Sequence, residues 1–494
     1  MRNPLILSVD IGTSAVKAVL FDPKLNQIGI SRKSYPLITP RSGWSEQDPK
    51  TILINVKESI TEVLKTIGDV KTVVGIVLSC QMYSVLAVDP QGKPITPILS
   101  WSDNRSNEVS KKIRLVSNPQ RIYQITGCPI EGIYPLSKIR WMIENDYTTS
   151  DSRYISIKDY IIFHLTGQFI TDWSMASSSG MMDIRKHRWD PDILAMVGIN
   201  SENLSELVSP WHVMCLGDSD FLNQTGILVG TPLVVGAGDA PLSSLGVGAL
   251  NPEILVVNVG TSTAARKIIT EPLTDPKQRL WTYALDEAHW VIGGMSSSGG
   301  MVYEWFLNQF MTSPRIENTE IHTDFEDLAA LTTPGADGLL FVPYLLGEQS
   351  PAWQPKTRGG FLGLDISHNR GHLTRAVLEG ITYSIYRIIE TIQSVHTTPI
   401  KEIRVTGGLA ASRLWQQIAS DIFGLPLLIT ESNEGSARGG AIMAWQALGY
   451  LNSIQDIDLD SLTKAHIQPR EEIHEFYMEQ YQKYLAYVEC INKA

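Results

Sequence analysis

Two Gly-Thr-Ser turns, each between two apolar segments, are the parts of this sequence best suited to holding phosphate. The first lies in LILSVDIGTSAVKAVLFDP and the second in ILVVNVGTSTAARKII. Their residues are Gly12, Thr13, Ser14, Gly260, Thr261 and Ser262. Consecutive backbone N–H groups and hydroxyls can bind phosphate oxygens, and Asp10, before the first turn, can hold magnesium directly or through water. A plain hairpin also favours glycine, but two facing turns can hold a triphosphate from both sides.

The carboxylate of Asp239 is a second candidate for chemistry. It ends the run Gly236–Asp239, and the apolar strand expected over residues 231–238 ends directly before it. Asp239 is therefore expected at the carboxyl end of a strand, where α/β proteins place their chemistry. Phosphoryl transfer to an alcohol needs a carboxylate that accepts the hydroxyl proton. An Asp that caps a helix starting near Pro241 explains the same residues, and taken alone the cap is the more frequent arrangement.

Two polar loops with aromatic side chains are candidates for holding a sugar. Each follows an expected strand, and the first strand is VVGIVLS at residues 73–79. A sugar needs paired hydrogen-bond donors and acceptors for its hydroxyls and an aromatic ring for its apolar face. Polar loops in water would explain either loop by itself. The candidate residues are Gln81, Met82, Tyr83, Trp101 and Arg105.

Glycine-rich turns before helices are candidates for the rest of a nucleotide site. Gly407, Gly408 and Leu409 follow the strand EIRVT, and small residues there let adenine lie against the backbone while phosphates face a helix N-terminus. A strand–helix turn without a ligand fits these residues equally well. Gly299, before the helix MVYEWFLNQF, and the pair Gly439-Gly440 can likewise reflect close packing alone.

Alternating strands and helices in both halves predict an α/β protein of two domains. The second Gly-Thr-Ser turn comes 248 residues after the first, which suggests two domains of one architecture, each beginning with the same hairpin. We place the domains at 1–250 and 251–494. Asp48-Pro49 predicts a helix start, and residues 372–395 predict a long helix.

Composition excludes several classes of protein. The chain has 494 residues, a net charge of −11 and no run of Lys or Arg, which argues against a nucleic-acid or anionic-membrane partner. Four scattered cysteines, no signal peptide and no apolar membrane segment predict a cytoplasmic protein. Neither GxxxxGK[ST] nor a GxGxxG after a strand occurs, so P-loop and dinucleotide folds are not expected.

Taken in order, the motifs resemble the FGGY family of carbohydrate kinases, which have the actin-like fold, over nearly the whole chain. Within that family the sequence is most similar to gluconokinases, through ILSWSDNRS, PLSKIRWM, ISIKDYIIFHLTG and HWVIGG. Three positions depart from the pattern: Tyr83 stands where relatives have His, Gln349 where they have Arg, and Ile133 at a usually small or aromatic position. The motifs that carry the resemblance are DIGTSAVK, WSDNR, YPLSKIRWMIEN, GAGD, VGTST, PGADGLLFVPYLLGEQSPAW, RGGFLGL and TGGLAAS.

The resemblance implies two actin-like (ribonuclease H-like) domains flanking a nucleotide cleft. Domain 1–250 is expected to hold the sugar and the first phosphate turn, and domain 251–494 the ATP site. Asp10 would help to hold Mg²⁺, and Asp239 would be the general base. The first turn would approach the terminal phosphate, and the second turn with Gly299 would contact ATP from the other domain. The sugar would be lined by Gln81, Met82, Tyr83, Trp101 and Arg105, and adenosine would face Gly407, Gly408 and Leu409.

The implied function is ATP-dependent phosphorylation of a sugar or sugar acid, foremost D-gluconate to 6-phospho-D-gluconate. Arg105 is the expected partner of the gluconate carboxylate, because a guanidinium can bind a carboxylate through two hydrogen bonds. A ketose kinase of the xylulokinase type is the alternative, and a non-catalytic actin-like protein that binds ATP or a sugar is a remote one. The oligomeric state is open, with a homodimer as one option.

Overall fold

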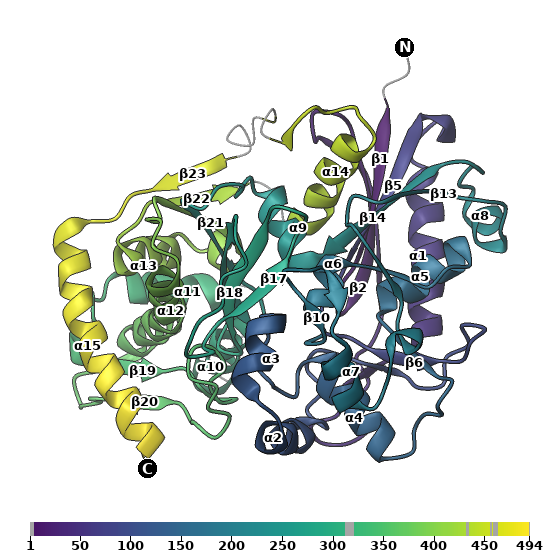
Figure 1. Ribbon diagram of the computed structural model, residues 1–494. Coiled ribbons are helices and arrows are strands. Elements are labelled where there is room, and N and C mark those ends of the chain that lie inside the picture. The colour runs from purple at the N-terminus through teal and green to yellow at the C-terminus, as the bar shows by residue number, and fades with distance from the viewer. Residues whose placement is uncertain (1–3, 312–320, 431–433, 455–456, 458–462, 494) are drawn as a thin grey trace. The chain divides into compact units, whose positions relative to one another are not determined.

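The computed structural model describes residues 4–311, 321–430, 434–454, 457 and 463–493 (Figure 1). The chain divides into two compact units. The first unit comprises Met1–Leu250, Ile269–Val291 and Glu434–Asp458. The second comprises Asn251–Ile268, Ile292–Asn433 and Leu459–Ala494. The chain has an α/β architecture with two large sheets, as the alternation of strands and helices predicts.

The large sheet of the first unit has six strands in the order β13-β14-β5-β1-β2-β3. All seven residues of β1 are buried, which is typical of a strand covered on both faces. β1 pairs antiparallel with β2, as the Gly-Thr-Ser turn between them predicts, and parallel with β5. The strands are β1 (Leu5–Ile11), β2 (Ala15–Phe21), β3 (Gln27–Ser34), β5 (Val73–Cys80), β13 (Val213–Cys215) and β14 (Pro232–Gly238).

Three parallel strands of this sheet end together at one edge. In the pairing of β1 with β5, Ile11 lies opposite Cys80, and in the pairing of β14 with β5, Gly238 lies opposite Cys80. The residues that follow the three strands therefore share this edge. They are the first Gly-Thr-Ser turn, the loop from Gln81, and Asp239.

Helices on this unit begin and end where local sequence dictates. Asp48 accepts hydrogen bonds from the backbone N–H groups of Lys50 and Thr51, and Pro49 opens α1 (Pro49–Leu64), as predicted. α14 (Gly435–Ala447) lies beside β1 and against α9 (Asp239–Gly246) (Figure 1). A side chain at Gly439 would overlap the carbonyl of Leu242 in α9, so this glycine serves close packing.

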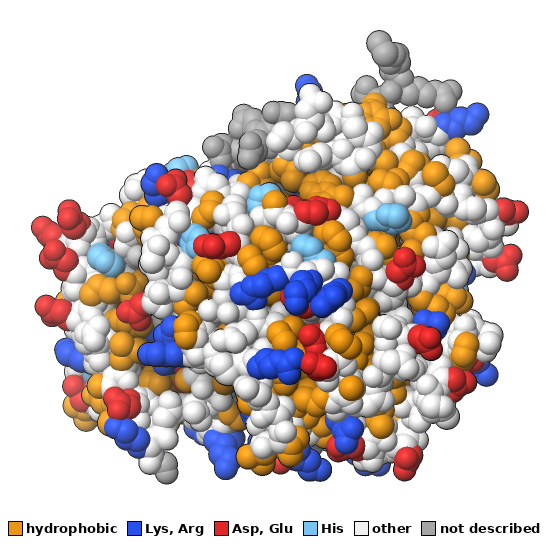
Figure 2. All heavy atoms as spheres, in the orientation of Figure 1, with side chains coloured by type: hydrophobic (Ala, Val, Ile, Leu, Met, Phe, Trp, Pro, Cys, Tyr) orange, Lys and Arg blue, Asp and Glu red, His pale blue; other side chains and the backbone are white. Residues whose placement is uncertain are grey.

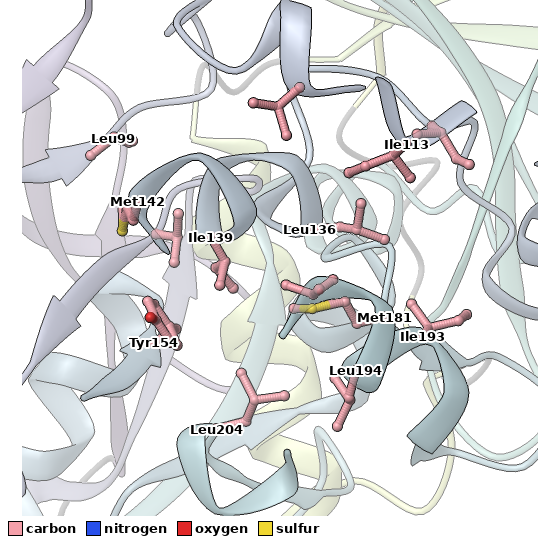
Figure 3. Close-up of a cluster of buried hydrophobic side chains, with 14 of the residues drawn as sticks. Leu99, Ile113, Leu136, Ile139, Met142, Tyr154, Met181, Ile193, Leu194 and Leu204 are labelled. Carbon is pink, nitrogen blue, oxygen red and sulfur yellow. The ribbon is translucent and has the colours of Figure 1, made fainter. Parts of the chain in front are cut away.

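A cluster of buried hydrophobic side chains supports the loops at this edge (Figure 3). α4 (Pro135–Glu144) supplies Leu136, Ile139 and Met142, which pack with Leu99 and Tyr154 from two short strands. The cluster therefore fixes α4 beneath the WSDNR loop that follows Leu99. This position of α4 determines where its buried polar side chains point.

The second large sheet has the order β17-β18-β16-β15-β21-β22-β23. β15 pairs antiparallel with β16 across the second Gly-Thr-Ser turn and parallel with β21, with Val259 opposite Gly407. The strand pattern around this turn is thus that of the first unit. The strands are β15 (Ile254–Val259), β16 (Thr263–Ile269), β17 (Trp281–Ala284), β18 (Trp290–Ser296), β21 (Glu402–Gly407), β22 (Leu427–Thr430) and β23 (Thr463–Ile467).

The helices of the second unit include the long helix predicted over 372–395, which begins two residues earlier as α12. The helices are α10 (Gly300–Phe306), α11 (Ile321–Ala330), α12 (Arg370–Val395), α13 (Arg413–Phe423) and α15 (Glu471–Lys493). A small ladder joins β19 (Leu340–Val342) and β20 (Gly360–Leu362). Within the described ranges, no helix combines the length and apolar character needed to cross a membrane.

The remaining elements of the first unit are short. The helices are α2 (Asn107–Val116), α3 (Pro119–Thr126), α5 (Ile157–Thr166), α6 (Trp173–Ser177), α7 (Pro191–Val197) and α8 (Asp220–Thr225). The strands are β4 (Glu46–Gln47), β6 (Leu86–Val88), β7 (Ile98–Leu99), β8 (Arg153–Ile155), β9 (Ile170–Asp172), β10 (Met182–Asp183), β11 (Arg188–Trp189) and β12 (Glu206–Val208).

Candidate active site

Asp10 lies at the end of β1 with its carboxylate held in place. The side chain is 6% exposed, and its Oδ1 accepts a hydrogen bond of 2.7 Å from the Ser79 hydroxyl on the neighbouring strand β5. The turn that follows is fixed from its carbonyl side, because the Tyr35 hydroxyl donates to the carbonyl of Gly12. This hydrogen bond to the Gly12 carbonyl helps to hold the turn in its conformation.

A chain of side-chain amides connects this turn to the proposed sugar loops. The Gln47 amide donates to the carbonyl of Thr13 at 2.6 Å, and the Gln81 amide donates to the Gln47 oxygen at 2.8 Å. The Trp101 indole donates to the Thr13 hydroxyl at 3.0 Å. Gln81 is 1% exposed, and its own Oε1 is buried without a hydrogen-bond partner. An unpaired buried acceptor next to the turn is suited to receiving a ligand hydroxyl.

Asp239 stands at the first residue of α9, directly after β14. It is half-buried, and its Oδ1 accepts a 2.7 Å hydrogen bond from the backbone N–H of Ala240. Gly238 precedes the helix, and no side chain caps its N-terminus, so the predicted helix start near Pro241 is two residues late. The pairing of β14 with β5 is irregular between Val234 and Ala237, shortly before this position.

The loop from Gln81 packs against the loop that carries Asp239. A side chain at Gly238 would come within 2.8 Å of the Met82 side chain, which is 2% exposed. Tyr83 adopts a left-handed backbone with φ of 65°, which is uncommon for a bulky residue. Its hydroxyl accepts a hydrogen bond from Tyr283 at 3.1 Å. The structure therefore brings Met82 and Tyr83 to the same edge as Asp239.

Lys138 of α4 connects the two proposed sugar loops. Its ammonium donates to the carbonyl of Tyr83 at 2.9 Å and to the carbonyl of Ser100 at 2.6 Å, and the side chain is fully buried. Burial lowers the pKa of Lys138 to about 7, although the nearby carboxylate of Asp103 acts in the opposite direction. Lys138 thus holds the strained Tyr83 backbone beside the start of the WSDNR loop.

Arg105 is engaged with protein carboxylates. Its guanidinium donates to both oxygens of Asp103 at 2.7 and 2.8 Å and to Glu46 at 2.6 Å. The side chain is 2% exposed and lies 3.6 Å from the Trp44 ring centre. These contacts favour a structural role, in which Arg105 anchors its loop to β4, over the predicted contact with a substrate carboxylate.

The second Gly-Thr-Ser turn, in the other unit, has different surroundings. Asn258 occupies the place that Asp10 has before the first turn, two residues ahead of the glycine. Gly260 and Thr261 are exposed, and the N-terminus of α10 packs on the turn, where Gly300 N–H donates to the carbonyl of Gly260 at 2.8 Å. A side chain at Gly299 would come within 2.7–2.9 Å of the turn's backbone. The requirement for glycine at 299 is therefore explained by packing.

The glycines after β21 lie beside this second turn. Gly407 has φ of 82°, and a side chain there would overlap the carbonyl of Val259. Gly407 and Gly408 are exposed, but the Leu409 side chain is fully buried. Any contact of Leu409 with adenosine would therefore come from its backbone. Ser412 caps the N-terminus of α13, because its hydroxyl accepts a 3.1 Å hydrogen bond from the backbone N–H of Trp415.

The donor set at the edge of the first unit fits a magnesium ion that is carried by a phosphate ligand. Mg²⁺ keeps several waters and takes one or two carboxylates together with substrate phosphates. Asp10 offers such a carboxylate, one oxygen of which is already fixed by Ser79. No group of three or more His, Cys, Asp and Glu side chains able to hold a metal occurs in the described part of the chain. An all-protein metal cage is therefore not found there.

Sequence reasoning did not single out Gln47, Ser79 or Tyr35, and it left the role of Lys138 undecided. Gln47 lies 34 residues from each of its two partners, Thr13 and Gln81. No spacing rule connects residues so far apart. A polar residue in the short strand β4 between two charged neighbours gives no local signal of burial, although Gln47 is fully buried.

The chain belongs to the FGGY family of carbohydrate kinases. The family's N-terminal domain matches residues 5–246, and its C-terminal domain matches residues 255–448. This agrees with the resemblance of the motifs and with the α/β architecture of both units.

Among relatives of known activity, a gluconokinase from Bacillus subtilis is 37% identical over 478 residues, which is 95% of this chain and 93% of that protein. A xylulose kinase from Lactococcus lactis is 28% identical over 480 residues, covering 94% of this chain and 91% of the relative. The crystal structure of a gluconate kinase from Lactobacillus acidophilus matches with a TM-score of 0.93 and 29% identity, covering 99% and 98% of the two chains. A ligand-bound xylulose kinase from the same organism gives the same values.

Proposed function

We propose that this chain transfers the terminal phosphate of ATP to D-gluconate and forms 6-phospho-D-gluconate. The observation that carries the proposal is the difference in identity between relatives of similar coverage, 37% for a gluconokinase against 28% for a xylulose kinase. Overall shape does not separate the two activities, because both structures from Lactobacillus acidophilus match with a TM-score of 0.93. The choice between them therefore rests on sequence.

In the proposed reaction, Asp239 accepts the proton of the attacking hydroxyl. Its position at the carboxyl end of β14, half-buried and beside the loop from Gln81, supports this role. The Gln81 oxygen accepts a hydrogen bond from another hydroxyl of the sugar acid, and Trp101 provides an aromatic face. The N–H groups of Thr13 and Ser14 face the phosphate that is transferred, since the N–H of Gly12 already donates to the carbonyl of Ala15 at 3.0 Å.

Asp10 would hold Mg²⁺ together with the phosphates of ATP. The ion, when bound, neutralises charge on the phosphate oxygens. In the second unit, Gly260 and Thr261 contact phosphates of ATP, and Gly407 and Gly408 lie against adenosine. We expect the protein to act in the cytoplasm on a small molecule, and a homodimer is one option for its assembly.

A xylulokinase-type activity is the second candidate. It is favoured by Arg105, because the guanidinium expected to receive the gluconate carboxylate is paired with Asp103 and Glu46. A neutral ketose would need no such partner. The proposed gluconate site must instead bind the carboxylate through hydrogen-bond donors other than Arg105.

The test is a coupled assay of ADP release by the purified protein. D-gluconate, D-xylulose, D-ribulose and glycerol are compared at equal ATP and Mg²⁺, and kcat/KM is measured for each. The proposal expects gluconate to have the highest kcat/KM. A higher kcat/KM for xylulose or another neutral substrate would replace it with the second candidate, and no turnover of any substrate would favour a non-catalytic protein.

A further inference from the structure

A cavity of about 750 Å³ opens on the first unit, and its lining does not include Asp239. It is formed around the β9–β12 ladder and the hairpin of β10 and β11. Its volume lies within the range of small-molecule sites. The lining residues are Arg153, Gln168, Phe169, His187, Arg188, Trp189, Ser201, Leu204, Ser205, Glu206 and Leu207.

The cavity is lined by two guanidinium groups that form no ion pair with a described carboxylate. Arg188 is exposed, and Asp183, opposite it in the β10–β11 ladder, pairs with Lys186 instead. Arg153 donates to the carbonyl of Leu204 at 3.2 Å and lies 5.0 Å from the centre of the Phe169 ring.

The described lining of the cavity holds two arginines against one carboxylate. Glu206 is its one lining carboxylate among the described residues. Burial lowers the pKa of His187, and the nearby carboxylates of Glu287, Asp183 and Asp286 act in the opposite direction. Figure 2 shows Lys and Arg side chains over the region of β10, with Asp and Glu side chains among them.

We propose that this cavity binds a small phosphorylated metabolite, with the phosphate between Arg153 and Arg188. A phosphate monoester carries close to two negative charges at neutral pH and accepts paired hydrogen bonds from guanidinium groups. A monocarboxylate offers half of that charge. The ring of Trp189 and the side chain of Leu207 provide apolar surface for the organic part of the ligand.

The cavity also adjoins a smaller internal cavity that reaches one of the proposed sugar loops. Trp189, Leu204 and Ser205 line both this cavity and a small internal one of about 40 Å³, which reaches Tyr83. The Trp189 indole donates to the carbonyl of Ser205 at 3.1 Å. A ligand that contacts Trp189 can therefore alter the packing around Tyr83. We infer that binding of this ligand changes the KM for the sugar substrate. This coupling, unlike the binding itself, rests on the proposed function.

The binding test is calorimetric titration of the full-length protein with glucose 6-phosphate and, separately, with uncharged glucose. Variants Arg188→Ala and Arg188→Lys are compared with Arg32→Ala, which removes the same charge from an exposed strand residue outside the cavity. We expect glucose 6-phosphate to bind, and Arg188→Ala to weaken it about tenfold or more. Arg188→Lys should weaken it less, and Arg32→Ala should leave it unchanged.

Absence of glucose 6-phosphate binding, or equal weakening by Arg188→Ala and Arg32→Ala, would overturn the site. The coupling is tested by measuring the KM for gluconate with and without glucose 6-phosphate. A change of KM in wild type and Arg32→Ala that is lost in Arg188→Ala supports it, and an unchanged KM in wild type contradicts it. Because calorimetry needs no turnover, failure of the proposed kinase activity would be seen separately.

Discussion

The two Gly-Thr-Ser turns share a strand pattern and differ in chemistry. Each lies between antiparallel strands, with a parallel neighbour ending beside it. Before the first turn stands the carboxylate of Asp10, fixed by Ser79, whereas the second has the neutral Asn258. The first is tied to side chains of the sugar loops, and the second is covered by the N-terminus of α10. On the proposed function, the first hairpin serves phosphoryl transfer and the second binds the nucleotide.

Asp10→Asn makes the first turn chemically like the second and should have the largest effect among the turn variants. The amide oxygen can still accept the Ser79 hydrogen bond, so the fold is preserved, but the negative charge that attracts Mg²⁺ is lost. We expect kcat to fall about 100-fold or more and the Mg²⁺ requirement to rise. Steady-state kinetics over a range of Mg²⁺ concentrations measure both.

The matched control is Asn258→Ala, which changes the equivalent residue of the second turn. It should change kcat far less than Asp10→Asn. Equal losses in the two variants would contradict the division of roles between the turns.

Gly260→Ala tests whether a ligand lies against the second turn. A methyl group at Gly260 would be 3.5 Å from its nearest protein atom, Asn258 Oδ1, which is ordinary contact. The protein should therefore fold with unchanged stability, while the KM for ATP rises about tenfold because the methyl group meets the phosphates. Thermal unfolding measures the stability of the variant, and steady-state kinetics measure its KM for ATP. An unchanged KM for ATP would show that the nucleotide does not lie against this turn.

Gly407→Ala should behave in the opposite way. With φ of 82° and no space beside the Val259 carbonyl, it should lower the free energy of unfolding by about 2 kcal/mol or more. Chemical denaturation without any ligand measures this loss. Normal stability would show that the glycine is required by a ligand and not by the fold.

Lys138→Met sharpens the comparison at the proposed sugar loops, to which the first turn is joined by hydrogen bonds. The variant leaves the carbonyls of Tyr83 and Ser100 without their ammonium donor, so we expect the KM for the sugar to rise about tenfold while kcat changes less. The KM for ATP should be nearly unchanged. A loss in kcat alone would place Lys138 in the chemistry and not in positioning.

The same lysine predicts a pH dependence of stability. Its pKa is about 7 in the folded protein and 10.5 as the ordinary value, so between these pH values the unfolded chain binds more protons. The free energy of unfolding should therefore rise with pH in this window. Denaturation at pH 7 and pH 9 should show wild type gaining stability relative to Lys138→Met. No relative gain would mean that Lys138 stays charged when buried.

Much of the architecture could be predicted because it follows from local sequence patterns. The apolar strand, the Gly-Thr-Ser turn and the second strand predict both hairpins, and Asp48-Pro49 predicts the start of α1. The placement of Gln81 and Asp239 after strands likewise follows from local sequence. Parallel pairing of β5 with β1 and β14 then brings them to one edge.

The contacts of individual side chains could not be predicted, since they join residues far apart in the chain. Arg105 has the right chemistry for a substrate carboxylate. No residue in its own loop indicates that its partner is Glu46, 59 residues away. Lys138 could be imagined at a ligand, but its acceptors are carbonyls that only the tertiary fold supplies. Leu409 follows two exposed glycines and is itself fully buried.

The most direct measurement of the central claim is the turnover of Asp239→Asn with gluconate, together with calorimetric binding of gluconate and ATP. The amide can occupy the same volume but accepts no proton, so kcat should fall about 1000-fold while both ligands bind with nearly wild-type affinity. Near-normal turnover would contradict the account, because Asp239 would then serve only the start of α9.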